Sequence, residues 1–231
     1  MSRDIYVSLS GATSTWAQMD IVANNMANTS TVGFKQDKLP FKVEGPNDHV
    51  LGEVYAMADE PVADFSDGAV MNDDDPLHFA LQGSGFLAVR DGDRTLLTRD
   101  GRFFMNEDRM VVNGQGMPLL GEGGPIEVPL NETLRVGTDG TIYGSESGEI
   151  DKLKLVGVES AERIGDNLWE PTSQMHAAKP TVIQGALEGS NVDILRSMTE
   201  LIEIGQYFEA YKKAMQSTDE LDARINRLGG K

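Results

Sequence analysis

Cysteine is absent from this chain of 231 residues. A disulfide framework, a thiolate metal site and a cysteine nucleophile are therefore excluded together. Histidine is scarce, because the chain has only His49, His78 and His176, which lie far apart in the sequence. A histidine-based metal site or catalytic triad would need groups from distant segments. We therefore expect no catalytic residue, no bound metal and no cofactor.

Basic residues are also few, since 20 lysines and arginines stand against 37 aspartates and glutamates, for a formal net charge of -17. Nucleic acids and anionic membranes bind basic surfaces, so we expect neither as a partner. No apolar run approaches the roughly 18–20 residues that span a bilayer. The N-terminal segment lacks the continuous apolar stretch of a signal peptide. The sequence predicts a soluble protein without membrane insertion.

Apolar residues near the N-terminus are spaced alternately by four and three. They are Ile5, Leu9, Ala12, Trp16, Met19, Ala23 and Met26. This heptad spacing predicts a helix that packs along another helix. The remaining positions are mostly small and uncharged, which suits close packing against protein on several sides. The alternative is a marginally stable polar helix.

The segment that follows favours turns. Residues 24–35 are rich in Asn, Thr, Ser and Gly, which compete with helical hydrogen bonds. Residues 36–75 show no sustained period and contain Pro40, Pro46 and Pro61. We expect an extended connector with short strands there.

The centre of the chain, residues 76–184, reads as β structure. Short apolar runs alternate with turn dipeptides such as Asp91-Gly92, Asn113-Gly114 and Asp139-Gly140. Asp-Gly and Asn-Gly between apolar runs are strong hairpin signals because these residues tolerate positive φ. The short, repeated spacing favours a barrel or a sandwich.

A helical pattern returns after Ser190, which we take as the capping residue. Its apolar positions lie mostly three or four apart: Leu195, Met198, Leu201, Ile202, Phe208, Tyr211, Met215, Ile225 and Leu228. Gly205 inside this helix indicates either a close backbone contact or a bend. The fold class is therefore α+β, with two terminal amphipathic helices packed as a coiled-coil-like pair and a central, mainly β domain inserted between them. We expect a helical assembly domain at 1–35 and 185–231, a connector at 36–75 and an outer β domain at 76–184.

Three short patterns imitate functional motifs. Gly83-Ser84-Gly85 begins a loose dinucleotide-binding pattern, but β-type residues follow where a helix is required, so a tight turn is favoured. The run Asp73-Asp74-Asp75 lacks EF-hand spacing and reads as a solvated acidic turn. Arg99-Asp100-Gly101 resembles an adhesive loop, but residues 98–102 also make an ordinary hairpin turn, which is favoured.

Signatures at both ends and in the centre occur in an order typical of one family. The N-terminal signature includes residues 20–28 and Thr31-Val32-Gly33-Phe34-Lys35. The central one includes Leu81-Gln82-Gly83-Ser84-Gly85-Phe86 and Thr98-Arg99-Asp100-Gly101, and the C-terminal one spans residues 182–192. Together they resemble bacterial flagellar rod and hook proteins over nearly the whole chain. The length and the Arg3-Asp4-Ile5-Tyr6 opening are most like the proximal rod protein; the distal rod protein and the hook protein are the alternatives.

This resemblance implies a structural subunit and no enzyme. In the family, terminal helices form the inner layer of a helical tube and the β domain lies outside. The subunit is exported by the flagellar type III apparatus, joins copies of itself and other rod proteins of the proximal and distal rod, and transmits motor torque to the hook. It is located in the flagellar basal body, in the rod that crosses the periplasm. The helices alone bury little surface, so we also expect order at the ends to depend on assembly.

The expected assembly interface combines the helical pattern with the family signatures. Its N-terminal part is Ile5, Leu9, Ala12, Trp16, Met19, Ala23, Asn24, Asn25, Met26, Asn28, Gly33 and Phe34. Its C-terminal part is Leu187, Ser190, Asn191, Val192, Leu195, Met198, Leu201, Ile202, Phe208, Tyr211 and Met215. A competing interpretation is a secreted binding module with a β-domain ligand and a helical stalk. Such a module would show a concentrated aromatic or basic patch, whereas aromatic residues are 6% and scattered.

Overall fold

The structure is a computed structural model that describes residues 3–44, 55–58, 60–130 and 132–229, with side chains described for 8–40, 60–130, 132–218 and 220. Contacts divide the chain into two compact units. The helical unit contains Met1–Asn28, Gln36–Asp64 and Val192–Lys231, and the β unit contains Thr29–Lys35 and Phe65–Asn191. This division groups residues 29–35, 65–75 and 185–191 with the β unit, whereas the expected boundaries placed them in the assembly domain or the connector.

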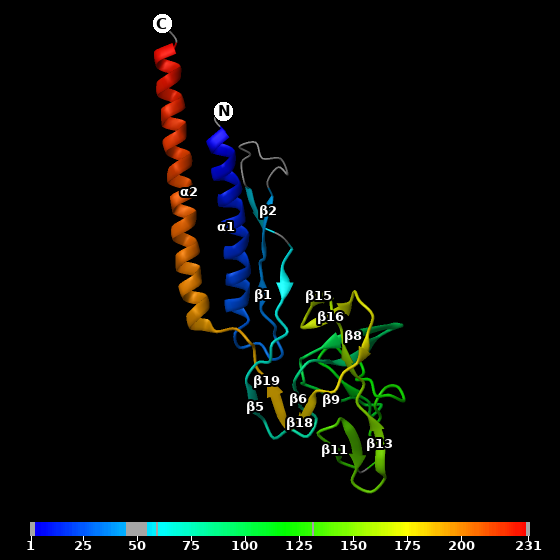
Figure 1. The fold of residues 1–231 in the computed structure, drawn as a ribbon. Coiled ribbons are helices and arrows are strands. Elements are labelled where there is room, and N and C mark those ends of the chain that lie inside the picture. The colour runs from blue at the N-terminus through cyan, green and yellow to red at the C-terminus, as the bar shows by residue number, and fades with distance from the viewer. Residues whose placement is uncertain (1–2, 45–54, 59, 131, 230–231) are drawn as a thin grey trace. The chain divides into compact units, whose positions relative to one another are not determined.

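The helical unit is built on two antiparallel helices, α1 (Arg3–Ala27) and α2 (Ile194–Gly229), which lie side by side with both chain ends at the same end of the pair (Figure 1). The predicted cap at Ser190 is wrong by three residues. Asp193 caps α2 instead, because its Oδ1 accepts from the amides of Leu195 at 3.0 Å and Arg196 at 3.2 Å. Neither helix, over the residues described, has an apolar stretch long enough to cross a membrane.

The segment after α1 packs as an antiparallel ribbon. Strand β1 (Asp37–Lys38) pairs with β4 (Val62–Ala63), and β2 (Phe41–Glu44) pairs with β3 (Tyr55–Ala58), which lies against α1. The Asn25 amide group ties this ribbon to the helix: it donates to the Asp37 carbonyl at 2.8 Å and accepts from the Asp37 amide at 2.9 Å. The expected connector thus contains the short strands predicted for it, but its first part is anchored rather than free.

Within the subunit, one column of the α1 heptad is buried or partly buried and the other is exposed. Ala12 is buried, and Met19 and Met26 are partly buried. The alternate column, Leu9, Trp16 and Ala23, is exposed, with Trp16 at 67%. The side chain of Ile5 lies outside the described residues. A two-column seam toward α2 therefore does not form, and small or polar residues near Ala12 fill the buried face.

The β unit contains antiparallel strands of three to six residues with some shorter pairs (Figure 1). Its largest sheet has the order β15-β16-β8-β7-β14-β17 and its second has the order β11-β12-β13. The strands are β5 (Val70–Asn72), β6 (Phe79–Gln82), β7 (Phe86–Asp91), β8 (Arg94–Thr98), β9 (Phe104–Met105), β10 (Val111–Val112), β11 (Leu134–Val136), β12 (Thr141–Gly144), β13 (Gly148–Lys152), β14 (Leu155–Gly157), β15 (Ala161–Gly165), β16 (Leu168–Pro171), β17 (His176–Ala177), β18 (Thr181–Gln184) and β19 (Ala186–Glu188).

One apolar core joins these sheets. It includes Phe79, Leu87, Phe103, Ile126 and Leu153, all almost fully buried. Each such side chain contributes roughly 1.5–3 kcal/mol by leaving water. The predicted hairpins at residues 91–92 and 139–140 are confirmed, since β7 pairs with β8 and β11 pairs with β12. The α+β class is confirmed at this level: two terminal helices with a mainly β region between them.

Candidate assembly surfaces and their anchoring

The side chain of Glu188 brings together the three sequence signatures inside the β unit. Its Oε1 accepts from Lys35 Nζ at 2.6 Å, and its Oε2 accepts from an Arg99 guanidinium nitrogen at 2.9 Å. All three side chains have no exposed surface. We call these three residues the Glu188 cluster. It joins the end of the N-terminal signature, the central signature and the C-terminal signature at one point.

Hydrogen bonds with main-chain groups add to the ion pairs of the Glu188 cluster, although Arg99 Nε is buried without a hydrogen-bond partner among the described residues. Lys35 Nζ also donates to the Ser66 carbonyl at 2.6 Å, and Arg99 donates to the Gly83 carbonyl at 2.6 Å. The amide of Gly68 donates to Glu188 Oε1 at 2.9 Å. Burial lowers the pKa of Lys35, and the neighbouring Glu188 carboxylate opposes that shift. Charges buried this deeply are tolerated because each is paired and hydrogen-bonded.

Gly33 lets the main chain pass close to this cluster. Its amide donates to the Glu188 carbonyl at 2.7 Å, and its φ is +69°. A Cβ at this position would lie 2.5 Å from main-chain atoms of Arg99 and Asp100. Both the positive φ and the contact require glycine here.

A stack of side chains holds Phe34 in place beside the same point. The Arg163 guanidinium lies 4.5 Å from the centre of the Phe34 ring on one side and 4.6 Å from the Trp169 ring on the other. The Asn167 side-chain amide donates to the Val32 carbonyl at 2.8 Å. Cation–π contacts of this kind are worth about 0.5–2 kcal/mol each. The N-terminal signature is therefore fixed by β15 and β16 as well as by Glu188.

These contacts separate the expected interface residues into two groups. Gly33, Phe34 and Leu187 are buried within the β unit, and Asn25 is buried in the helical unit. Asn28, Ser190, Asn191 and Val192 are partly buried near the points where the chain passes between units. Such residues position the chain, and they offer little surface to another subunit.

Helix α2 carries an exposed apolar patch on its first turns. Leu195 is 74% exposed and Ile202 is 63% exposed, with Met198 between them. Their spacing of three and four puts them on one face, opposite buried Ile204. Further along, Leu201, Phe208, Tyr211 and Met215 are partly buried. We call Leu195, Met198 and Ile202 the α2 patch.

Helix α1 presents a second apolar column. Leu9 and Trp16 lie seven residues apart on one face and are at least half exposed. Ala23 continues this face, and Asn24 is exposed beside it. We call Leu9, Trp16 and Ala23 the α1 column. Large apolar side chains exposed in a row are the usual mark of a surface that meets another protein.

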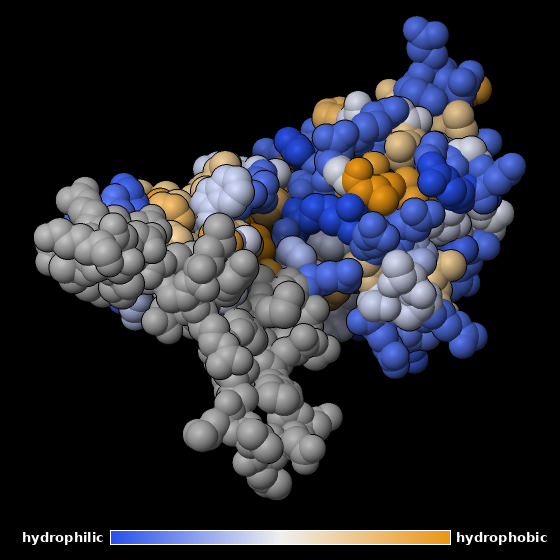
Figure 2. Space-filling model, turned by 90° about the horizontal axis from the view of Figure 1, so that it is seen from above, coloured by the Kyte–Doolittle hydropathy of each residue, from blue (hydrophilic) through white to orange (hydrophobic). Residues whose placement is uncertain are grey.

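Charge is distributed unevenly between the helices and the rest of the chain. Helix α1 has only Arg3, Asp4 and Asp20 as charged residues, and acidic and basic residues nearly balance in α2. Most of the net negative charge therefore lies outside the helices. Figure 2 shows hydrophilic residues over most of the surface drawn in colour. Nearly neutral helices can approach one another without strong repulsion.

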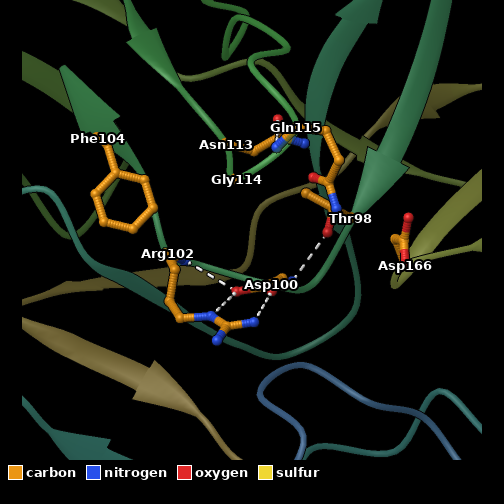
Figure 3. Close-up of a pocket in the computed structure, with 8 residues that line it drawn as sticks. All are labelled: Thr98, Asp100, Arg102, Phe104, Asn113, Gly114, Gln115 and Asp166. Carbon is orange, nitrogen blue, oxygen red and sulfur yellow. Dashed lines mark hydrogen bonds and ion pairs between the residues drawn. The ribbon is translucent and has the colours of Figure 1, made fainter. Parts of the chain in front are cut away.

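A pocket of about 170 Å³ in the β unit is lined by eight residues, of which Thr98, Asp100 and Arg102 bond one another (Figure 3). Arg102 donates from two side-chain nitrogens to Asp100, at 3.0 and 2.6 Å, and this hydrogen bonding raises the pKa of Arg102. The Asp100 amide donates to Thr98 Oγ1 at 3.0 Å. Phe104 forms an exposed apolar edge. The Arg102 cation is paired with Asp100, and Asp166 lines the pocket as a second carboxylate.

The structure explains the three short patterns that resemble functional motifs. Gly83 and Gly85 form the turn between β6 and β7 with positive φ, as the tight-turn interpretation predicts. Arg99 is buried and bonded to Glu188, so it cannot act in an adhesive loop. The acidic run is a turn in which Asp73 bonds His78 and Asp75 accepts from the Leu77 amide. Among the described residues no group of three metal-binding side chains occurs.

Comparison with known proteins gives the same order of segments. Three family models match the chain. The model described as "Flagella basal body rod protein" matches residues 5–35, and the one described as "Flagellar hook protein FlgE/F/G D1 domain" matches residues 80–144. The model described as "Flagellar basal body rod FlgEFG protein C-terminal" matches residues 183–228. The chain is 32% identical to the flagellar basal-body rod protein FlgF of Salmonella typhimurium over 250 residues, covering 99% of this chain and 98% of that protein.

Two further relatives extend the comparison. FlgF of Caulobacter vibrioides is 32% identical over 243 residues, covering 99% of each chain. The rod protein FlgG of Bacillus subtilis is 25% identical over 256 residues, covering 96% of this chain and 97% of that protein. The higher identity to FlgF agrees with the expected resemblance to the proximal rod. The chain therefore belongs to the family of flagellar basal-body rod proteins and is a structural subunit of the basal-body rod.

Proposed function

We propose that this subunit assembles helically through its two terminal helices and thereby transmits torque from the motor to the hook. The observation that carries the proposal is the pair of exposed apolar surfaces, the α1 column and the α2 patch. Covering a large apolar side chain contributes about 1.5–3 kcal/mol, which favours association. The same surfaces cost free energy while they face water. In our proposal, neighbouring subunits bury these two surfaces.

The two surfaces differ, and this difference favours a helical arrangement. A contact between unlike faces of two copies is heterologous, and it propagates as a helix when it does not close into a ring. In our proposal the α1 column of one subunit packs on the helices of a neighbour, while its α2 patch meets another. The helix pair itself then forms a coiled-coil-like bundle shared among several subunits. The β unit lies outside this bundle.

The other proposed properties follow from membership of the rod family. The partners are copies of this chain and the other proteins of the proximal and distal rod. Export through the flagellar type III apparatus brings the subunit to a rod that crosses the periplasm. A chain without cysteine forms no wrong disulfides in that oxidising compartment. The role is structural and needs no catalytic group or cofactor.

Two equally exposed leucines provide the test. Leu195 is 74% exposed on the α2 patch, and Leu130 is 75% exposed on the β unit. In a strain that lacks the native subunit, Leu195→Asp should leave the purified protein folded but abolish swimming and rod assembly. Leu130→Asp should fold and restore swimming. Normal rods with Leu195→Asp, or loss of rods with Leu130→Asp alone, would contradict the proposal.

A further inference from the structure

Residues Thr29–Lys35 belong to the β unit although the segments on both sides of them belong to the helical unit. We propose that this segment is an internal key, whose insertion completes the fold of the β unit and which the Glu188 cluster locks in place. The β unit then remains open whenever another protein holds the N-terminal segment. The inference rests on contacts inside the β unit and does not depend on the proposed mode of assembly.

The first support is electrostatic. Glu188 accepts from two buried cations, Lys35 and Arg99, and one of these comes from the key. Withdrawing Lys35 removes the ammonium group from the Ser66 carbonyl and from Glu188 Oε1. The Ser66 carbonyl keeps the Asn191 side-chain amide as a donor, and Glu188 Oε1 keeps the Gly68 amide. Glu188 then keeps its pair with Arg99 but loses the shorter of its two buried ion pairs, and water takes the place of the ammonium group. Removing the key therefore exposes the surroundings of Glu188 to water.

The second support is the number of separate segments that meet at the key. The Gly33 amide bonds the Glu188 carbonyl at 2.7 Å, and the Asn191 amide bonds the Phe34 carbonyl at 3.4 Å. The Glu188 side chain then connects to Gly68 and to Arg99. Main-chain donors that lose a buried partner each cost free energy. The key thus organises the part of the β unit that contains β19 and the loop before β5.

The third support is aromatic packing. Phe34 is 2% exposed and lies against Arg163, which in turn covers Trp169 of β16. The ring of Phe65, at the start of the next part of the β unit, meets Trp169 edge-on at 5.1 Å. Withdrawing Phe34 would uncover one face of this stack. Trp169 therefore lies within reach of the key and can report its position.

The consequence is an order of events within the chain. A protein that binds residues 29–35 competes directly with Glu188, Arg163 and Asn167 for the same groups. While it is bound, the central region can form strands, but the β unit cannot close around the Glu188 cluster. Release of the N-terminal segment then allows the final step. This is a conformational device built into the fold, in which one end of the chain controls a unit far along the sequence.

The test uses the full-length chain with Trp16→Phe, which leaves Trp169 as its single tryptophan. Lys35→Met removes the buried ammonium group and keeps the side-chain length. Lys38→Met is the matched control, because Lys38 is 65% exposed and pairs with Asp64 at the surface. We expect Lys35→Met to lower the urea midpoint of the Trp169 transition by about 1 M or more. We expect Lys38→Met to change it by less than about 0.5 M.

Hydrogen exchange on the unmutated chain shows whether residues 29–35 open together with the β unit or detach from it alone. A key opens only with the unit that it completes, so amides of residues 29–35 should exchange within about tenfold of those in β7 and β8. Faster exchange of 29–35, with the core still protected, would show a strap that detaches alone and would overturn the inference. An unchanged Trp169 midpoint in Lys35→Met would overturn it as well.

Discussion

The ring of Tyr211 lies directly over Gly11, so that a Cβ on residue 11 would be 2.6 Å from two of the ring carbons. This contact joins α1 to α2 across 200 residues of sequence. A larger side chain at position 11 would push the ring away from α1. The glycine therefore fixes which side of α1 faces α2, and it explains why the α1 column points elsewhere.

Substituting Gly11→Val should weaken the helix pair by about 1–3 kcal/mol, because the added methyl groups displace the ring. Tyr211→Ala should remove the clash, so the double variant should lose less than the sum of the two single losses. Chemical denaturation followed by circular dichroism measures all three. Simple additivity would contradict a direct contact between the two positions.

Substitution of Gly205 in α2 should raise the stability of the subunit, whereas substitution of Gly11 lowers it. A Cβ at this position would meet no atom within 4 Å, so the close contact that the sequence suggested does not occur. Gly205→Ala should then stabilise α2 by about 0.5–1 kcal/mol through helix propensity alone. The same denaturation experiment measures it, and a loss of stability would reveal a contact in the free subunit.

The sequence predicts the elements of this fold better than their contacts. The heptad spacing of residues 5–26 locates α1 within two residues, and the Asp-Gly dipeptides locate two hairpins. Both signals are local, since they depend on backbone preferences. The choice of buried face in α1 is not local, because Gly11, Thr15 and Val22 face protein only when α2 and the ribbon are present. A spacing rule alone finds both columns of the heptad but does not tell which of them is exposed in the subunit, as the column of Trp16 is.

Because Trp16 is exposed in the subunit, Trp16→Asp should impair assembly and leave folding almost unchanged. In the free subunit the substitution should alter the free energy of unfolding by no more than about 0.5 kcal/mol. Rod assembly should nevertheless fail, because a charge would enter an apolar contact between subunits. Thermal unfolding of the purified variant and electron microscopy of basal bodies measure the two effects. Ala12→Asp is the contrast, since Ala12 is buried and its substitution should destabilise the subunit itself.

Trypsin should distinguish two lysines that lie three residues apart. Lys35 is fully buried in the Glu188 cluster, whereas Lys38 is 65% exposed. Brief digestion of the native subunit should cut after Lys38 and spare Lys35, because cleavage requires the local chain to open. Mass spectrometry of the fragments reads the result directly. If the ordered part of the subunit were limited to the β domain expected at residues 76–184, trypsin would cut after both lysines.

Acid should loosen the sheet β11-β12-β13 through two carboxylates. Hydrogen bonds from Thr141 lower the pKa of Asp139 below 3.8, and hydrogen bonds from Ser147 lower that of Glu132 below 4.5. A folded pKa below the unfolded one gives stability that is present above the unfolded value and is lost as pH falls through the folded one. Between about pH 5 and about pH 3, Thr141→Val should therefore lose less stability than the unmutated chain. Urea midpoints across this range test it, and equal pH slopes would exclude the hydrogen bond as the cause.

The Glu188 cluster shows why the anchoring site escaped prediction. Lys35, Arg99 and Glu188 all lie in the family signatures, but nothing in their spacing says that they meet. One signal was available for two of the three: Lys35 follows Phe34, and Glu188 lies between Leu187 and Gly189, whereas Arg99 has the polar neighbours Thr98 and Asp100. Charged residues in such surroundings are buried only when they are paired. Their partners become known only from the packing of segments more than 60 residues apart.

A side-chain-resolution electron microscopy reconstruction of the basal-body rod with this subunit in place tests the central claim most directly. Our account predicts that Trp16 of the α1 column and Leu195 of the α2 patch each lie in contact with another subunit, with the β unit toward the outside. A rod in which both residues face solvent, and in which the β units alone hold the subunits together, would contradict it.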